Sequence, residues 1–207
     1  MYESLSVAVA RSALNPKGAM RVEAGYADGT GGDDQYSGLE WLQLGNHKIP
    51  VDENVSALIP YRGPQGSFQY ISATDVLNNK VNPADLNNKI VLLGTTAAGL
   101  MDLRATPVQN IYAGVEIHAN MIAGILDNNI KEHPAYMLGA EFLLLLIVGL
   151  FLAMILPSLS PLWATIVTLV TTVLVVALNL SAWQYANLVM PLAAILVMIA
   201  SIYFINM

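Results

Sequence analysis

Five polar side chains between positions 102 and 120 are the residues of this chain best suited to bind a ligand, namely Asp102, Arg104, Glu116, His118 and Asn120. Asp102 can accept hydrogen bonds from a ligand, and Arg104 can pair with an anion. A structural alternative stays open, in which Asp102 and Arg104 cap the loop or the helix that follows. His118 is three residues from Val115 and four from Ile122, so a buried, hydrogen-bonded histidine is the alternative there.

The segment Gly94-Thr-Thr-Ala-Ala-Gly99 has the glycine spacing of a phosphate-binding loop. Such a loop needs Lys and then Ser or Thr directly after it, and this chain has Leu and Met there, so no cation is available to hold phosphates. We therefore reject nucleotide binding. Thr95 and Thr96 remain candidates for ligand binding or signalling, while the glycines indicate the end of a strand and a turn.

Several other chemistries are weakly supported. The three histidines have no paired spacing and the chain has no cysteine, so we predict no metal site and no cofactor. Asp33 and Asp34 could touch a cation, but a solvated turn is the simpler interpretation. A nucleophile elbow is absent, so we predict no catalytic residue. The formal charge of −6 argues against nucleic acid as a partner.

The elements that position these residues form two very different regions. All 9 basic and 15 acidic residues lie at or before Glu141, and residues 142–207 carry none. Three apolar runs, at about 135–156, 162–180 and 188–207, each approach the roughly 20 residues that cross a bilayer as a helix. We therefore predict an all-α transmembrane region of three helices over residues 134–207, with Trp183 and Tyr185 at an interface.

Polar residues in these runs are few, which argues against a channel or transporter. We interpret the polar residues of the second run as groups that hydrogen-bond between helices, namely Thr165, Thr168, Thr171, Thr172 and Asn179. Glu141 lies one turn inside the first run, where it caps, snorkels or pairs. The loops between the runs contain no Lys or Arg, so the positive-inside rule does not fix the orientation.

Residues 1–133 are predicted to form an α/β domain, a mixed sheet with flanking helices. The pattern predicts helices at 4–14 and 114–126, a short helix after Ser72 or Thr74, a helical turn at Pro83, a hairpin around Gly45-Asn46, and strands at 57–61, 68–71 and 89–94. The run at 89–94 does not alternate, as expected for a strand covered on both faces. Residues 128–134 form a short connection that should pass a shift of the preceding helix to the first span.

Four motifs give a specific resemblance: Tyr61-Arg-Gly-Pro-Gln-Gly-Ser-Phe68, Lys89-Ile-Val-Leu-Leu-Gly-Thr-Thr-Ala-Ala-Gly-Leu-Met-Asp102, Thr106-Pro107 and Gly114-Val-Glu-Ile-His-Ala-Asn120. The chain resembles the CHASE2 family over about residues 1–133. The resemblance implies an extracytoplasmic sensory domain of a bacterial receptor, followed by three spans and a cytoplasmic output domain. A first span, the first part of the sensory domain and the output domain are expected to lie outside this sequence, which looks like a fragment.

The resemblance places residues 1–133, which we call the head, outside the plasma membrane. It also implies that the chain is a sensor without catalytic activity of its own. The output it implies is a nucleotide cyclase such as adenylate cyclase, with a protein kinase or diguanylate cyclase as alternatives. The expected partners are the lipid bilayer, an unidentified small-molecule or envelope ligand, and a second copy in a homodimer. A membrane-anchored hydrolase, a transport or partner subunit, and an assembly-only product are the competing hypotheses.

Overall fold

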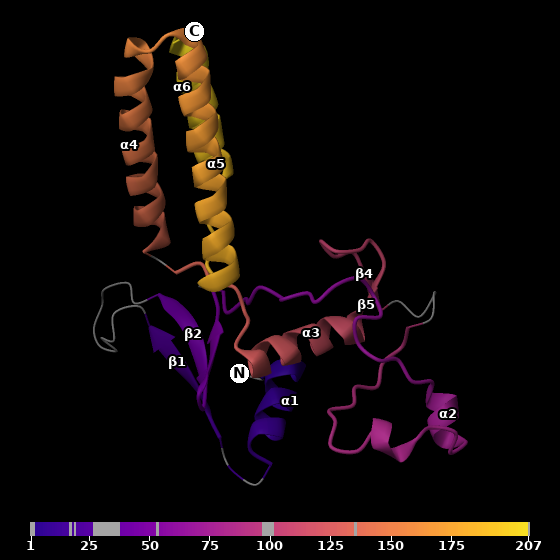
Figure 1. Cartoon of the computed structure of the whole chain (residues 1–207). Helices are drawn as coiled ribbons and strands as arrows, with labels where there is room; N and C mark the ends of the chain where they lie inside the picture. The colour runs from indigo at the N-terminus through magenta and orange to yellow at the C-terminus, as the bar shows by residue number, and fades with distance from the viewer. Residues whose placement is uncertain are drawn as a thin grey trace. The chain divides into compact units, whose positions relative to one another are not determined.

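The structure is a computed structural model that describes residues 3–16, 18, 20–26, 38–52, 54–96, 102–134 and 136–206. The chain forms two compact units. The first consists of Met1–Ala24, Trp41–Ile49 and Ala57–Ile130, and the second of Gly25–Glu40, Pro50–Ser56 and Lys131–Met207. Figure 1 shows the elements of both in chain order. Asp33, Asp34 and Gly99, which carry some of the predictions above, lie outside the described residues.

Two helices form the frame of the first unit, and both were predicted. Helix α1 spans Leu5–Leu14, and the Ser4 hydroxyl caps it by accepting a hydrogen bond from the Val7 amide at 3.4 Å. Helix α3 spans Gly114–Asp127 and ends at Asn128, whose φ of 51° is left-handed. The two helices pack against each other. Each carries buried apolar side chains, among them Val7 of α1 and Ile122 of α3.

The predicted hairpin around Gly45-Asn46 is confirmed. Strand β2 spans Leu39–Leu44 and β3 spans His47–Pro50, with Gly45 at a φ of +59° in the turn between them. Strand β1, Val22–Tyr26, completes a sheet in the order β1-β2-β3.

The strands predicted at 57–61, 68–71 and 89–94 are wrong. Residues 90–96 run without regular structure, and Leu93 is 89% exposed. An apolar run becomes a strand only when another strand accepts and donates its backbone hydrogen bonds, and none of the described residues does so here. The second sheet is instead the short antiparallel pair of β4, Leu103–Arg104, with β5, Tyr112–Ala113. The head therefore combines helices with small sheets.

Two short predicted helical elements are also present. Helix α2 spans Ala73–Leu77 after Ser72, whose side chain makes no cap bond. A 3-10 turn, η1, spans Pro83–Asp85, and the Asn82 side chain accepts a hydrogen bond from the Ala84 amide at 3.1 Å. Pro83 occupies its first position, where a missing amide hydrogen costs nothing.

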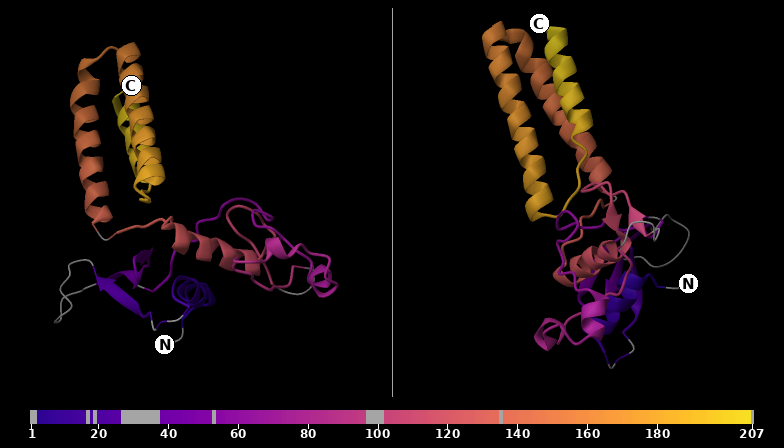
Figure 2. Two further views of the ribbon diagram at one scale, coloured as in Figure 1. Left: turned by 60° about the horizontal axis from the view of Figure 1, so that its bottom comes forward. Right: turned by 90° about the vertical axis from the view of Figure 1, so that its right-hand side faces the viewer.

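The apolar region forms helices α4, Met137–Ile155, η2, Leu156–Ser158, α5, Pro161–Tyr185, and α6, Ala193–Asn206. Among the described residues, two helices are long and apolar enough to cross a membrane, Met137–Ser158 with a mean hydropathy of 2.6 and Pro161–Tyr185 with 2.2. Only 11% of each is buried, which distinguishes them from core helices of a soluble protein. The views in Figure 2 show α4, α5 and α6 side by side.

The third predicted run is helical over a shorter stretch than expected. Helix α6 has 14 residues and rises only about 21 Å, less than a hydrocarbon core of roughly 30 Å. It begins late because residues 186–192 form a turn and an extended segment that contains Pro191. Ile195 and Ile199 are nonetheless buried against α4 and α5, in a cluster with Leu152 and Val175.

The polar residues of α5 only partly follow the prediction. The Thr165 hydroxyl lies 2.9 Å from the Tyr203 hydroxyl of α6, and the Asn179 amide donates to the Met190 carbonyl at 2.9 Å. Thr168 and Thr172 donate instead to carbonyls one turn earlier in α5 itself, at 2.9 and 2.8 Å. The prediction of hydrogen bonds between helices is therefore wrong for Thr168 and Thr172. A threonine hydroxyl in a helix easily reaches the backbone carbonyl four residues earlier in the same helix.

Candidate functional site

The polar face of α3 is occupied by the loop of residues 61–70, through Glu116. This side chain is 2% exposed. Its two carboxylate oxygens each lie 3.1 Å from the Gly66 amide, and Oε1 also accepts from the Phe68 amide at 3.4 Å. Oε2 accepts from the Tyr70 hydroxyl at 2.6 Å. These donors, together with the position in the first turn of α3, stabilise a buried carboxylate that no described basic side chain contacts.

Asn120 extends the same contact one helical turn further along α3. Its side chain is fully buried, and its Oδ1 accepts from the Arg62 amide at 2.9 Å. Its Nδ2 donates to the Tyr112 hydroxyl at 2.9 Å and to the Glu116 carbonyl at 2.8 Å. Residues four apart share a helix face, so Glu116 and Asn120 hold the loop together. We call this arrangement the loop clamp: Glu116, Asn120 and Tyr112 on one side, residues 61–70 on the other.

The pKa of Tyr70 is raised by burial and by its contact with Glu116. Burial of its hydroxyl, and then the hydrogen bond to Glu116 and the charge of that carboxylate, raise the pKa of Tyr70 to about 12. The residue as a whole is 45% exposed, although its hydroxyl donates to the buried Glu116. Burial also raises the pKa of Tyr61 and of Tyr112, whose rings meet edge to face at 5.5 Å.

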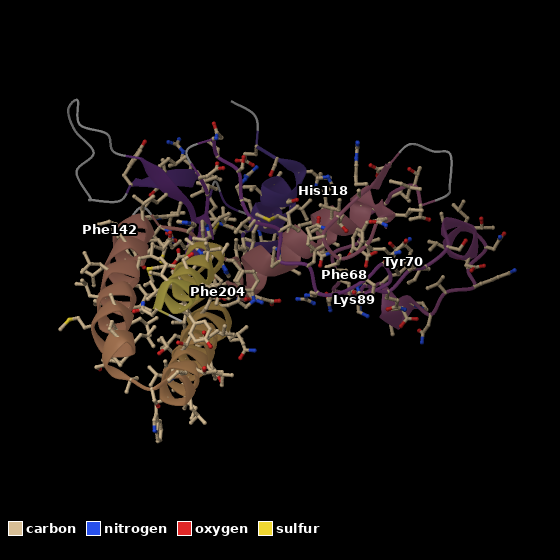
Figure 3. All side chains as sticks on the ribbon, turned by 90° about the horizontal axis from the view of Figure 1, so that it is seen from above. Phe68, Tyr70, Lys89, His118, Phe142 and Phe204 are labelled. Atoms are coloured by element: carbon tan, nitrogen blue, oxygen red, sulfur yellow. The ribbon has the colours of Figure 1, made fainter. Side chains whose placement is uncertain are left out.

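His118 lies on the other side of α3 from the loop clamp, toward α1. Its Nδ1 is 2.9 Å from the hydroxyl of Ser6, which is 4% exposed. His118, which is labelled in Figure 3, therefore joins the two helices through this hydrogen bond. The other histidine of this unit, His47, hydrogen-bonds the Ile125 carbonyl at 3.0 Å, at the last turn of α3. The described residues include no group of three or more potential metal ligands.

Asp102 lies at the N-terminal end of α3. Its carbonyl accepts from the Gly114 amide at 2.8 Å, and a side chain at position 114 would overlap its carboxylate. Arg104 is exposed on β4 opposite Tyr112. Thr95 and Thr96 are exposed and belong to the irregular segment 90–96. Of the seven predicted site residues, only Glu116 and Asn120 are joined by a hydrogen bond.

Sequence reasoning missed a hollow beside the loop clamp. It measures about 520 Å³ and is lined by Gln65, Gly66, Phe68, Gln69, Tyr70 and Gln109. The Gln109 side chain accepts a hydrogen bond from the Gln65 backbone amide at 2.9 Å. This bond connects Gln109 to the loop of residues 61–70. The lining offers amide groups and two aromatic rings, and Phe68 and Tyr70 are visible in Figure 3. Residues 61–68 contribute to its lining. In the sequence they stood out as a motif, but nothing in the motif indicated a hollow.

In the second unit, the segment before α4 lies against the turn between α5 and α6. The Glu132 amide donates to the Asn187 carbonyl at 2.8 Å, and the Val189 amide donates to the Glu132 carbonyl at 3.0 Å. The start of α4 and the end of α5 are thus at the same end of the bundle. Glu141 faces His133, with 3.6 Å between Oε1 and Nε2, a distance at which the two would pair if His133 is protonated. That oxygen is buried and has no hydrogen bond.

The first unit holds a loop against a helix, and the second contains two apolar helices of membrane-crossing length with exposed sides, which suggests association with a membrane. The chain belongs to the CHASE2 family, because the CHASE2 domain matches it over residues 2–156. CHASE2 domains are extracytoplasmic sensory domains of signalling receptors and are not catalytic. The match begins in the head and runs through the whole of α4. No curated protein and no solved structure matches the chain.

Proposed function

We propose that the chain is the sensory and membrane-anchoring part of a bacterial signalling receptor. Its head lies outside the plasma membrane, and its helices carry a signal to a cytoplasmic output domain, a nucleotide cyclase such as adenylate cyclase. A kinase or a diguanylate cyclase output is the alternative. The observation that carries the proposal is the continuous CHASE2 match over residues 2–156, which joins the sensory head to the first apolar helix.

Three crossings of the membrane fit the second unit best. The hydrogen bonds of Glu132 hold the start of α4 beside the end of α5, as expected for two antiparallel spans. Helix α6 starts from the same end and packs along α4 and α5. The apolar residues 188–192 precede it and lengthen its 14 residues toward a full span. Residues 134–207 then form the membrane module and residues 1–133 the sensor.

Sensing is assigned to the loop clamp and the surfaces next to it. A ligand changes the receptor only if it binds one arrangement of the head better than another. The hollow beside Tyr70 offers such a place, since a ligand there would contact the loop that Glu116 holds. Asp102, Arg104 and His118, with Thr95 and Thr96, are the further candidates for ligand binding or signalling. The ligand is a small molecule or an envelope component, and the receptor acts as a homodimer.

The topology is testable because the chain contains no cysteine. Single cysteines at exposed positions, Gln69→Cys in the head, Ser160→Cys before α5 and Asn206→Cys at the end of α6, are made in the natural reading frame. In intact spheroplasts, a membrane-impermeant thiol reagent should label position 69 and should not label positions 160 and 206. Labelling of position 206 would mean that only α4 and α5 cross the membrane. Protection of position 69 would refute an extracytoplasmic head.

A further inference from the structure

Within the second unit, the Lys131 side chain contacts the end of α5 and the turn that follows it. Its Nζ donates to the Trp183 carbonyl at 2.6 Å and to the Asn187 side-chain oxygen at 2.7 Å, and it lies 5.2 Å from the centre of the Trp183 ring. The last carbonyls of a helix lack partners within the helix, and a cation at that end is favoured by the helix dipole. Lys131 supplies a hydrogen-bond donor for the Trp183 carbonyl and a positive charge at the C-terminal end of α5.

The shape of the turn after α5 supports this contact. Asn187 has a φ of 56°, and the Leu188 amide donates back to the Ala182 carbonyl at 3.1 Å. This conformation presents the Asn187 side chain to Lys131 and the Asn187 carbonyl to the Glu132 amide. Burial lowers the pKa of Lys131, because it removes water from the ammonium group.

We propose that Lys131 is the residue that couples the segment after α3 to the turn between α5 and α6. We call Lys131, the Trp183 carbonyl and the Asn187 side chain the Lys131 tie. The inference rests on the proposed function and deepens it, because it names where the signal enters the membrane module. Residues 128–134 were expected to pass a shift of α3 to the first span. Through the Lys131 tie, a displacement of this segment reaches α5 and α6 together with α4.

The experiment uses the natural absence of cysteine. Glu132 and Leu188 are β-bridge partners, and strands in such contact lie about 5 Å apart, within the range that a disulfide spans. The Glu132→Cys/Leu188→Cys chain in lipid nanodiscs should therefore crosslink on mild oxidation. Adding Lys131→Met, which keeps most of the aliphatic stem and removes the donor, should slow crosslinking at least about tenfold, because two charge-assisted hydrogen bonds are lost. Lys131→Arg should restore most of the rate.

The matched control is Lys48→Met. Lys48 also lies over an indole ring, 4.7 Å from the centre of the Trp41 ring, but in the hairpin. Its replacement should leave the crosslinking rate unchanged. Hydrogen exchange of the Val189 amide, which donates to the Glu132 carbonyl, gives a second readout without cysteines and should also quicken about tenfold in Lys131→Met.

Equal crosslinking and equal Val189 exchange with and without Lys131 would overturn the tie. That result is distinct from failure of the proposed function. A tie that holds while the thiol labelling pattern shows a cytoplasmic head would refute the receptor topology alone. A broken tie with the expected labelling pattern would leave the receptor in place and return the signal to α4.

Discussion

The loop of residues 61–70 and the segment of residues 90–96 are both irregular, and both were expected to contain strands. The loop is held by α3, since Glu116 accepts from the Gly66 and Phe68 amides and Asn120 accepts from the Arg62 amide. The segment has no such acceptors among the described residues, and Val91 and Leu93 are 62% and 89% exposed. Two buried polar side chains therefore do for the loop what a neighbouring strand would do in a sheet.

Removing the Glu116 side chain should make the loop of residues 61–70 as weakly held as segment 90–96, and it is the substitution with the largest expected effect. Glu116→Ala leaves the Gly66 amide and the Tyr70 hydroxyl without their acceptor, which should cost about 3 kcal/mol in the free energy of opening of the loop. Hydrogen exchange of the peptide covering residues 61–70 measures it. Glu23→Ala, at an exposed acidic residue, should change the same value by less than about 0.5 kcal/mol. An unchanged loop in Glu116→Ala would show that the clamp does not hold it.

A smaller effect is expected where the chain leading to the loop touches α3. A side chain at position 124 would overlap the ring of Pro60, which cannot rotate away. Gly124→Ala should therefore lower the melting temperature of the head, with a cost of about 1–2 kcal/mol after the gain in helix propensity. Gly139→Ala in α4 is the matched helical control, because nothing lies within 4 Å of the added group. It should be neutral or stabilising. Equal behaviour of the two variants would contradict the close approach at Pro60.

Alkaline pH should weaken the loop clamp through Tyr70. The pKa of Tyr70 is 10.0 without the clamp and about 12 within it, so the unfolded chain loses the proton first. This contribution to stability is therefore complete below about pH 10 and falls as the pH rises toward 12. Melting temperatures measured across this range should fall less in Tyr70→Phe than in the parent chain. A fall that is the same in both would assign the effect to Tyr61 and Tyr112, whose pKa values are also raised.

Sequence reasoning succeeded where the signals are local. The helices at 4–14 and 114–126 and the glycine turn at position 45 depend on neighbouring residues alone. It failed for residues 89–94, because a strand requires a partner and the pattern carries no information on whether one exists. Apolar length identified α4 and α5 but overestimated α6, whose start is displaced by the turn after α5.

The candidate site shows the same division. The spacing of Glu116 and Asn120 places them on one face of α3, and the sequence identified both as polar residues of interest. Their partners are backbone amides about fifty positions earlier in the chain, at Arg62 and Gly66. No side-chain pattern marks a backbone amide as a donor. The loop clamp therefore became visible only with the fold.

The smallest effect should come from Leu93, and it sharpens the comparison most. Leu93→Thr replaces an 89% exposed side chain, so the free energy of unfolding of the head should change by less than about 0.5 kcal/mol. The same substitution at Leu44, which is fully buried in β2, should cost at least about 2 kcal/mol, because it removes packed methyl groups and buries a hydroxyl. Urea unfolding of both variants measures the contrast. A large cost at Leu93 would mean that segment 90–96 is covered in solution, and the difference between it and the clamped loop would then disappear.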